Sequence, residues 1–215
     1  HCRNCRLSYG VNNDLRLLFE REINDFIERD GPSTTDSLDF DLEKRQKYIM
    51  KYGWFNPSLY ICILIDRAVN SSGGLALEIG AGMGFLAYIM RNGIGVKEWI
   101  VTDGMCGETF HKTGKHWVDV QHKLASDAVK KYNTANCLVI AWPECGENYA
   151  TEALEIFTER SDYRSCVILW GERRGGCTGN DALYELLETK YRLDCRVDID
   201  SWKHIYECVS IYKIK

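Results

Sequence analysis

The segment from residue 75 to residue 87 constrains the fold of this chain more than any other. It begins with an apolar run around Glu78. Three alternating glycines follow this run: Gly80, Gly82 and Gly84. An amphipathic stretch comes next and stops at Asn92 and Gly93. This order predicts a buried parallel strand, a tight turn without side chains, and a helix that ends at a glycine C-cap. A ligand can lie directly on the backbone of such a turn, and the free N–H groups of the helix start favour an anionic group.

The spacing of the acid and the glycines indicates which cofactor the turn would hold. Dinucleotide-binding folds favour the pattern G-x-G-x-x-G, whereas here an acid on the strand precedes Gly-x-Gly-x-Gly. The pattern resembles motif I of the class I S-adenosylmethionine (SAM) methyltransferases. This resemblance implies that the turn residues bind the methionine part of SAM: Glu78, Gly80, Ala81, Gly82 and Gly84. An ordinary strand–helix turn and a nicotinamide site are the alternatives.

A second predicted strand covers residues 98–103 and ends in an acid. Asp103 follows Gly84 by nineteen positions (103 − 84), close to the roughly twenty-residue spacing of a ribose-binding carboxylate. We therefore expect Asp103 to bind the ribose hydroxyls, with a simple strand-end cap as the alternative. Residues 124–127 are a further candidate for contact with the adenine edge.

Composition limits the class of protein. The chain has 215 residues, 45% hydrophobic and 27% charged, with a formal net charge of −4. This suits one α/β domain and does not resemble the basic footprint of a dedicated nucleic-acid binder. No stretch approaches the ~20 apolar residues of a membrane span, so we expect no membrane partner.

Cysteine usage indicates the redox compartment. Most of the ten cysteines fall in predicted strands and loops, where free cysteine behaves as a small buried hydrophobe. A reducing, cytoplasmic setting is therefore expected. Cys2 and Cys5 form a lone C-x2-C, which is either half of a zinc site or part of a disordered terminus. His111, His116 and His122 lack the spacing of helical metal ligands, and no metal site is predicted.

The order of elements predicts a doubly wound α/β sheet of seven mostly parallel strands, with N-terminal helices and an antiparallel C-terminal strand. Residues 1–70 form a helical extension of the same domain and a possible substrate lid, and residues 71–215 form the SAM-binding part. The expected helices cover about 14–30, 41–52, 56–69, 124–132 and 147–159. The third has Asn56 as its N-cap and Pro57 at its first position, and a further helix is capped by Asn180 or Asp181. The other expected strands cover 117–120, 137–142, 166–170, 191–198 and 206–214.

The unusual residues fall at the carboxyl ends of the predicted strands, where ligands bind in such sheets. Trp142, Pro143 and Glu144 follow the fourth strand, and Glu172 follows the fifth. We expect these four residues to face the methyl acceptor, with Trp142 offering its ring face and Glu144 acting as a base or positioning an amine. Trp54 is expected to cover the cofactor or to shape the acceptor pocket. Sheet-edge packing and solvated loop carboxylates are the alternatives.

Several motifs together resemble a group of class I methyltransferase-like proteins with W-P-P and G-G-x-T-G motifs. They are residues 51–58, the glycine motif after Glu78, Trp142 with Pro143, and Gly171-Glu172 with residues 175–179. The resemblance spans about residues 41–187 and implies SAM binding. Glu144 stands where that group has a second proline. The Lys-Asp-Lys-Glu tetrad of RNA ribose 2′-O-methyltransferases is not evident, which argues against cap methylation.

The sequence therefore predicts a SAM-dependent methyltransferase whose acceptor is a protein, a small molecule or RNA. A catalytically inactive methyltransferase-fold scaffold is the first alternative, because the motif after the fourth strand departs from the usual pattern. An NAD(P)-dependent oxidoreductase is the second alternative. The oligomeric state does not follow from the sequence.

Overall fold

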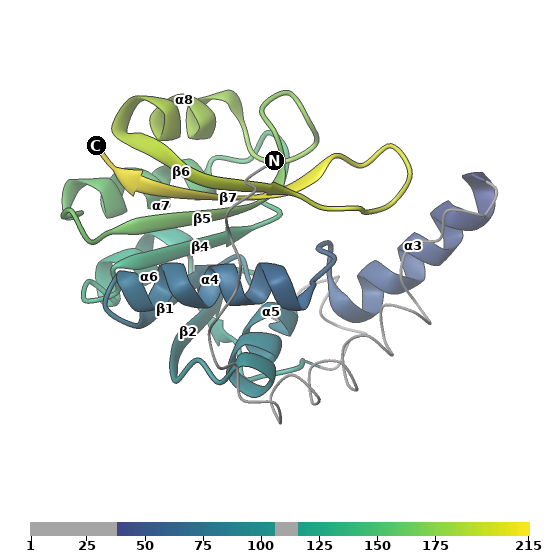
Figure 1. The fold of residues 1–215 in the computed structure, drawn as a ribbon, viewed down its shortest axis with the longest axis horizontal. Helices are drawn as coiled ribbons and strands as arrows, with labels where there is room; N and C mark the ends of the chain where they lie inside the picture. The colour runs from purple at the N-terminus through teal and green to yellow at the C-terminus, as the bar shows by residue number, and fades with distance from the viewer. Residues whose placement is uncertain (1–37, 106–115) are drawn as a thin grey trace.

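The computed structural model describes residues 38–105 and 116–215, with side chains from residue 42 onward. The predicted helix that begins at Asp14, the Cys2 and Cys5 pair, and His111 lie outside these residues. Within the described part, the chain forms one sheet with helices packed on both of its faces (Figure 1).

The seven strands follow the order β3-β2-β1-β4-β5-β7-β6. Strands β3, β2, β1, β4 and β5 are parallel, and β7 lies antiparallel between β5 and β6. This confirms the predicted α/β sheet and its antiparallel C-terminal strand. The strands are β1 (Leu75–Ile79), β2 (Glu98–Asp103), β3 (Gln121–His122), β4 (Cys137–Ala141), β5 (Cys166–Glu172), β6 (Tyr191–Asp198) and β7 (Glu207–Ile214).

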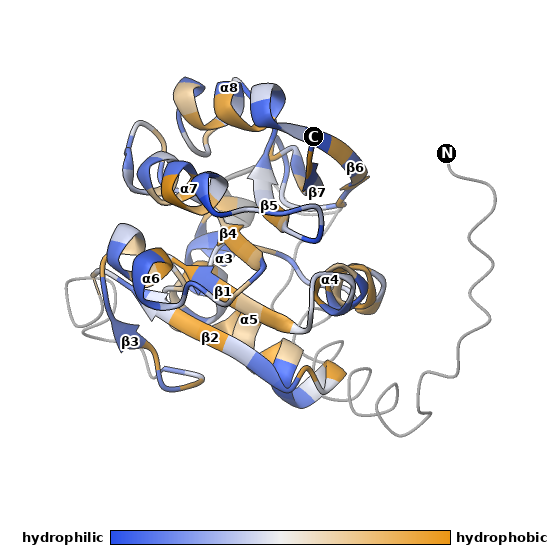
Figure 2. Cartoon of the chain, turned by 90° about the vertical axis from the view of Figure 1, so that its left-hand side faces the viewer, coloured by the Kyte–Doolittle hydropathy of each residue, from blue (hydrophilic) through white to orange (hydrophobic). Residues whose placement is uncertain are grey.

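The helices form two layers because successive residues of a buried strand point to opposite faces. The helices are α3 (Leu38–Tyr52), α4 (Leu59–Ser71), α5 (Phe85–Tyr88), the π-helix η2 (Ile89–Ile94), α6 (Ala125–Lys131), α7 (Tyr149–Glu159) and α8 (Asp181–Lys190). Ala76 and Val139 pack with α4, α5 and η2, whereas Leu77 and Leu138 pack with α6, α7 and α8. Figure 2 shows α4 on one side of the strands and α6 and α7 on the other.

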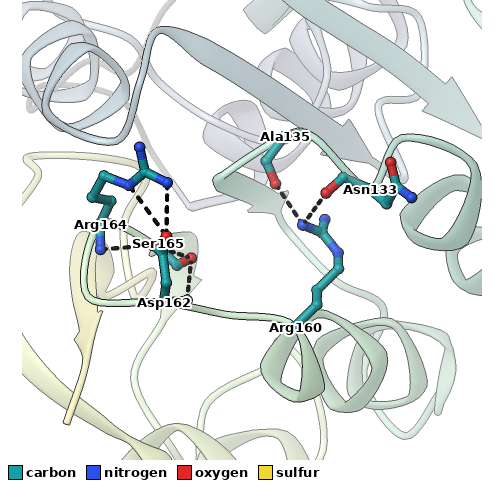
Figure 3. A network of polar contacts seen from close by, with 6 residues as sticks. All are labelled: Asn133, Ala135, Arg160, Asp162, Arg164 and Ser165. Atoms are coloured by element: carbon teal, nitrogen blue, oxygen red, sulfur yellow. Dashed lines mark hydrogen bonds and ion pairs between the residues drawn. The ribbon is translucent and has the colours of Figure 1, made fainter.

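A polar network lies at the amino-terminal edge of the parallel strands (Figure 3). Arg160, which follows α7, donates from Nη1 to the carbonyl oxygens of Asn133 at 2.8 Å and Ala135 at 3.0 Å. Asp162 accepts hydrogen bonds from the backbone and the guanidinium of Arg164. These contacts hold the two loops that lead into β4 and β5.

Helix α4 begins later than predicted. Ser58, not Asn56, is its N-cap, and its hydroxyl accepts from the N–H of Ile61 at 3.3 Å. Asn56 is occupied elsewhere, because its backbone N–H donates to Glu207 and its side-chain amide donates to the carbonyl of Asp200. Asn56, which the local pattern assigned to the N-cap, therefore makes long-range hydrogen bonds instead.

The helix after the glycine turn also differs from prediction. It continues as the π-helix η2 and ends at Gly95 with φ 87°, not at Gly93. The C-cap shifts because the next residue, Val96, is buried and donates its N–H to the carbonyl of Met90 at 2.9 Å.

The prediction of a strand at 117–120 is wrong. The Trp117 N–H donates to the carbonyl of Met83 at 2.9 Å, and the strand that pairs with β2 is the two-residue β3. The predicted strand residues instead pack against the glycine turn. The cap of α8 is Asn180, whose side chain accepts from the N–H of Leu183 at 2.8 Å.

Candidate functional site

The turn after β1 adopts the conformation that its glycines allow. Gly80, Gly82 and Gly84 have φ values of 63°, 57° and 77°, a region that side-chain-bearing residues rarely adopt. A Cβ atom at Gly84 would lie 2.5 Å from Cγ2 of Val118, and one at Gly80 would lie 3.0 Å from the hydroxyl of Tyr149. Glycine is therefore required at Gly80 and Gly84 both by the conformation of the turn and by the side chains packed against it.

Asp103 joins the end of β2 to the same turn. Its Oδ2 accepts from the N–H of Gly82 at 2.8 Å, and its Oδ1 accepts from the N–H of Met105 at 2.7 Å. The side chain is 7% exposed. Each carboxylate oxygen has a second lone pair, so the group can bind hydroxyls while it holds the turn. Sequence and structure thus bring Asp103 and the glycines together.

Glu78 lies below the turn inside the sheet. It is 1% exposed, and its Oε2 accepts from Nε1 of Trp99 at 2.7 Å. Burial raises the pKa of Glu78 to about 8, against the smaller lowering effects of the Trp99 hydrogen bond and of Arg91. Contact between the Glu78 carboxyl and a cofactor stays a prediction. In the structure, the hydrogen-bond partner of this carboxyl is Trp99 on the neighbouring strand β2.

Tyr149 is a site residue that sequence reasoning missed. It is the first residue of α7, and its hydroxyl lies against Gly80. Burial raises the pKa of Tyr149 to about 12, so the hydroxyl keeps its proton at neutral pH and can donate to a ligand. A tyrosine at a helix start carries no special signal in the sequence, and only the fold places it beside the turn.

The residues after β4 meet residues from the α3–α4 connection. Trp142 has a φ of 49°, which is unusual for a bulky residue, and its N–H donates to the carbonyl of Trp170 at 2.7 Å. Its ring stacks on Trp54, with centroids 5.9 Å apart and planes at 27°. The Arg45 guanidinium lies over the Trp54 ring, 5.4 Å from the centroid. Trp54 and Trp142, predicted separately, thus form one aromatic pair.

Pro143 and Glu144 belong to a loop that is bound to the loop after β5. The carbonyl of buried Pro143 accepts from the N–H of Gly179 at 2.8 Å, and Glu144 forms an isolated bridge with Thr178. The Glu144 side chain is exposed at this edge. The two loops therefore hold each other in place beside the aromatic pair.

Glu172, the last residue of β5, is 5% exposed. Its Oε2 accepts from the N–H of Cys177 at 2.6 Å, and its Oε1 accepts from the N–H of Tyr206 at 2.9 Å. These contacts anchor the glycine-rich loop and the β6–β7 turn. A direct role of Glu172 toward an acceptor stays a prediction.

Glu207 is a second residue that sequence reasoning missed. It opens β7 opposite Glu172 and is 1% exposed. Its Oε1 accepts from Nε1 of Trp170 at 2.6 Å, from the N–H of Asn56 at 2.9 Å, and from Nε1 of Trp142 at 3.4 Å. Burial raises the pKa of Glu207 above its usual range. A glutamate beside a predicted hairpin turn resembles a solvated residue, so no sequence signal marked it.

Two features are absent from the described residues. None of their helices is long and apolar enough to cross a membrane. The same residues contain no group of three or more potential metal ligands.

Comparison with solved structures identifies the fold. A Klebsiella pneumoniae protein assigned as an O-methyltransferase matches with a TM-score of 0.53 and 11% identity, over 94% of this chain and 100% of that chain. Magnesium protoporphyrin IX methyltransferase (ChlM) from Synechocystis PCC 6803, solved with bound SAM, matches with a TM-score of 0.50 and 11% identity, over 94% and 96%. No protein-family model and no curated protein matches the chain. The chain has the class I methyltransferase fold.

Proposed function

We propose that this protein is a SAM-dependent methyltransferase. The observation that carries the proposal is the joining of the bare, left-handed turn after β1 to the carboxylate at the end of β2. Asp103 and Gly82 are in hydrogen-bond contact at 2.8 Å, at the edge where ligands bind in doubly wound sheets. The class I methyltransferase fold, which ChlM shows with SAM bound, supports the same cofactor.

The residues present fit this cofactor. Glu78, Gly80, Ala81, Gly82 and Gly84 would hold its methionine part, and Asp103 would accept hydrogen bonds from its ribose hydroxyls. SAM supplies a methyl group activated by a sulfonium. For transfer of that group, the chain has to orient an acceptor in line and exclude water. Trp54 covers the edge, and the residues Trp142, Pro143, Glu144 and Glu172 lie where an acceptor would approach.

A ligand comparison tests the cofactor. We expect S-adenosylhomocysteine to raise the melting temperature, by an amount equivalent to about 2.7 kcal/mol at one hundred times its Kd, whereas NAD and NADP have no effect. The variant Asp103→Ala should weaken this stabilisation, and Asp119→Ala, which removes an exposed carboxylate, should keep it. Stabilisation by NAD or NADP alone would replace the proposal with an oxidoreductase.

A binding scaffold without catalysis is the second candidate. It is favoured by the loop contacts that occupy both oxygens of Glu172 and by Trp142 at a position where amino-group methyltransferases have an acid or amide. Incubation with labelled SAM and cell extract separates the two functions. A methyltransferase should label an extract component, and the label should be absent with Asp103→Ala. A scaffold should bind the cofactor and transfer nothing.

A further inference from the structure

The aromatic pair and the carboxyl group behind it have the chemistry of a cation-binding subsite. Trp54 is 41% exposed and stacks on Trp142, so the pair reaches the surface of the edge. Indole faces attract cations through the ring quadrupole. The chain itself shows this attraction, since the Arg45 guanidinium lies over Trp54.

Glu207 adds a negative group directly behind this pair. The indole N–H of Trp142 points to its Oε1 at 3.4 Å, and Trp170 donates to the same oxygen. In a buried position, a charge acts over several ångströms with little screening. Donation of the indole N–H toward a carboxylate also polarises the ring and makes its face more attractive to a cation.

The Glu207 carboxyl group can accept a further hydrogen bond. Within the part of the chain that the structure describes, its Oε2 has no hydrogen-bond partner, and no ion pair involves Glu207. Burial raises the pKa of Glu207, and the nearby Ser201 hydroxyl partly offsets that rise. The buried carboxyl therefore lacks the cation that usually accompanies such a group.

The surroundings favour a cation over a polyanion. Carboxyl groups other than the protonated Glu78 gather at this edge of the sheet, where Arg45 is the cation already seated on Trp54: Asp103, Glu144, Glu147, Glu172 and Glu207. The arginines after β5 are engaged, Arg173 with Asp198 and Arg174 with Asp181 and Glu188. A phosphate backbone would meet these carboxyl groups, whereas an ammonium group would be attracted by them.

We propose that Trp54 and Trp142, backed by Glu207, bind the protonated amino group of the methyl acceptor, so that the acceptor is an amine. This inference rests on the proposed function and names its substrate class. Trp54 and Trp142 contact the amine, and Glu207 is a positioning residue that acts through Trp142. Trp142 has a φ of 49°, and its indole N–H is directed toward the Glu207 carboxyl group.

Two probes of equal shape test the subsite on the full chain with S-adenosylhomocysteine present. Binding of phenethylamine and of phenethyl alcohol is measured by calorimetry at mildly alkaline pH, where the amine is still protonated. We expect the amine to bind about tenfold more tightly than the alcohol, which corresponds to about 1.4 kcal/mol. In Glu207→Gln the ratio should fall toward one. In Asp194→Asn, which loses an exposed carboxylate on β6, the ratio should persist.

The outcomes separate the two proposals. Equal binding of amine and alcohol, binding of neither, or an unchanged ratio in Glu207→Gln overturns the amine subsite. Failure to bind S-adenosylhomocysteine overturns the proposed function instead, while an amine preference that survives that failure leaves the subsite in place. If circular dichroism shows that Glu207→Gln does not fold, Trp54→Leu provides the second test. Its half-exposed ring can be removed with little effect on the core, and the amine preference should be lost with it.

Discussion

Two buried carboxyl groups show how single residues differ in their role at this edge. Asp103 accepts hydrogen bonds from two backbone N–H groups, whereas Glu78 has one indole donor and is enclosed by the sheet. The sequence placed both acids correctly at strand ends. It did not distinguish them, because burial and hydrogen-bond partners come from neighbouring strands.

The buried Glu78 should make stability depend on pH. Its pKa in the folded protein is about 8, against 4.5 for the ordinary group. Between these values the folded protein holds a proton that the unfolded chain releases. The free energy of unfolding should therefore fall as pH rises through this window, by an amount on the order of a few kcal/mol, and level off above it.

Urea unfolding of Glu78→Gln at several pH values checks this expectation. The amide oxygen can still accept from Trp99, but the side chain no longer titrates, so the decline with pH should shrink. Glu98→Gln removes an exposed carboxylate from the start of β2 and should keep the decline. An identical pH slope in Glu78→Gln and the unaltered protein would falsify the assignment to Glu78.

At the scale of elements, helix caps differ in how much structure they support. Ser58 only caps α4, with one contact at 3.3 Å. Asn180 caps α8, accepts from the Thr151 hydroxyl at 2.8 Å and donates to the carbonyl of Glu147 at 3.0 Å. It therefore also ties α8 to α7 and to the loop after β4.

We expect Asn180→Ala to cost about 2–3 kcal/mol of unfolding free energy, since a cap and further hydrogen bonds are lost together. Ser58→Ala should cost only about 1 kcal/mol, the usual value of a cap. Chemical denaturation of both variants measures the difference. Equal losses would show that the contacts of Asn180 with α7 contribute nothing.

The elements that the sequence predicted best are those with local signals. The strand 98–103 has the predicted bounds, since an apolar run and a terminal acid define it. The start of α4 and the position of β3 were wrong because distant partners decided them: Glu207 engages Asn56, and the glycine turn engages Trp117. Local pattern holds no information about such contacts.

At the scale of the whole molecule, the candidate site and the polar network around Arg160 and Arg164 lie at opposite edges of the parallel strands. The alternation of strands and helices predicted that the glycine turn, Asp103 and the residues after β4 share one edge. It did not predict Tyr149 or Glu207, because their place depends on how α7 and the antiparallel β7 meet that edge. The sequence therefore predicted where the candidate site lies in the fold, but only some of the residues that form it.

This division predicts where a bound cofactor should protect the backbone. Hydrogen exchange followed by mass spectrometry should slow on addition of S-adenosylhomocysteine in peptides that cover the turn after β1 and the end of β2, because binding orders both. Peptides around Arg164 at the amino-terminal edge (Figure 3) should exchange as before. NAD should change neither. Protection that appears first around Arg164, or equally at both edges, would place the ligand away from the glycine turn, since the proposal assigns the cofactor to that turn and to the neighbouring Asp103 carboxylate.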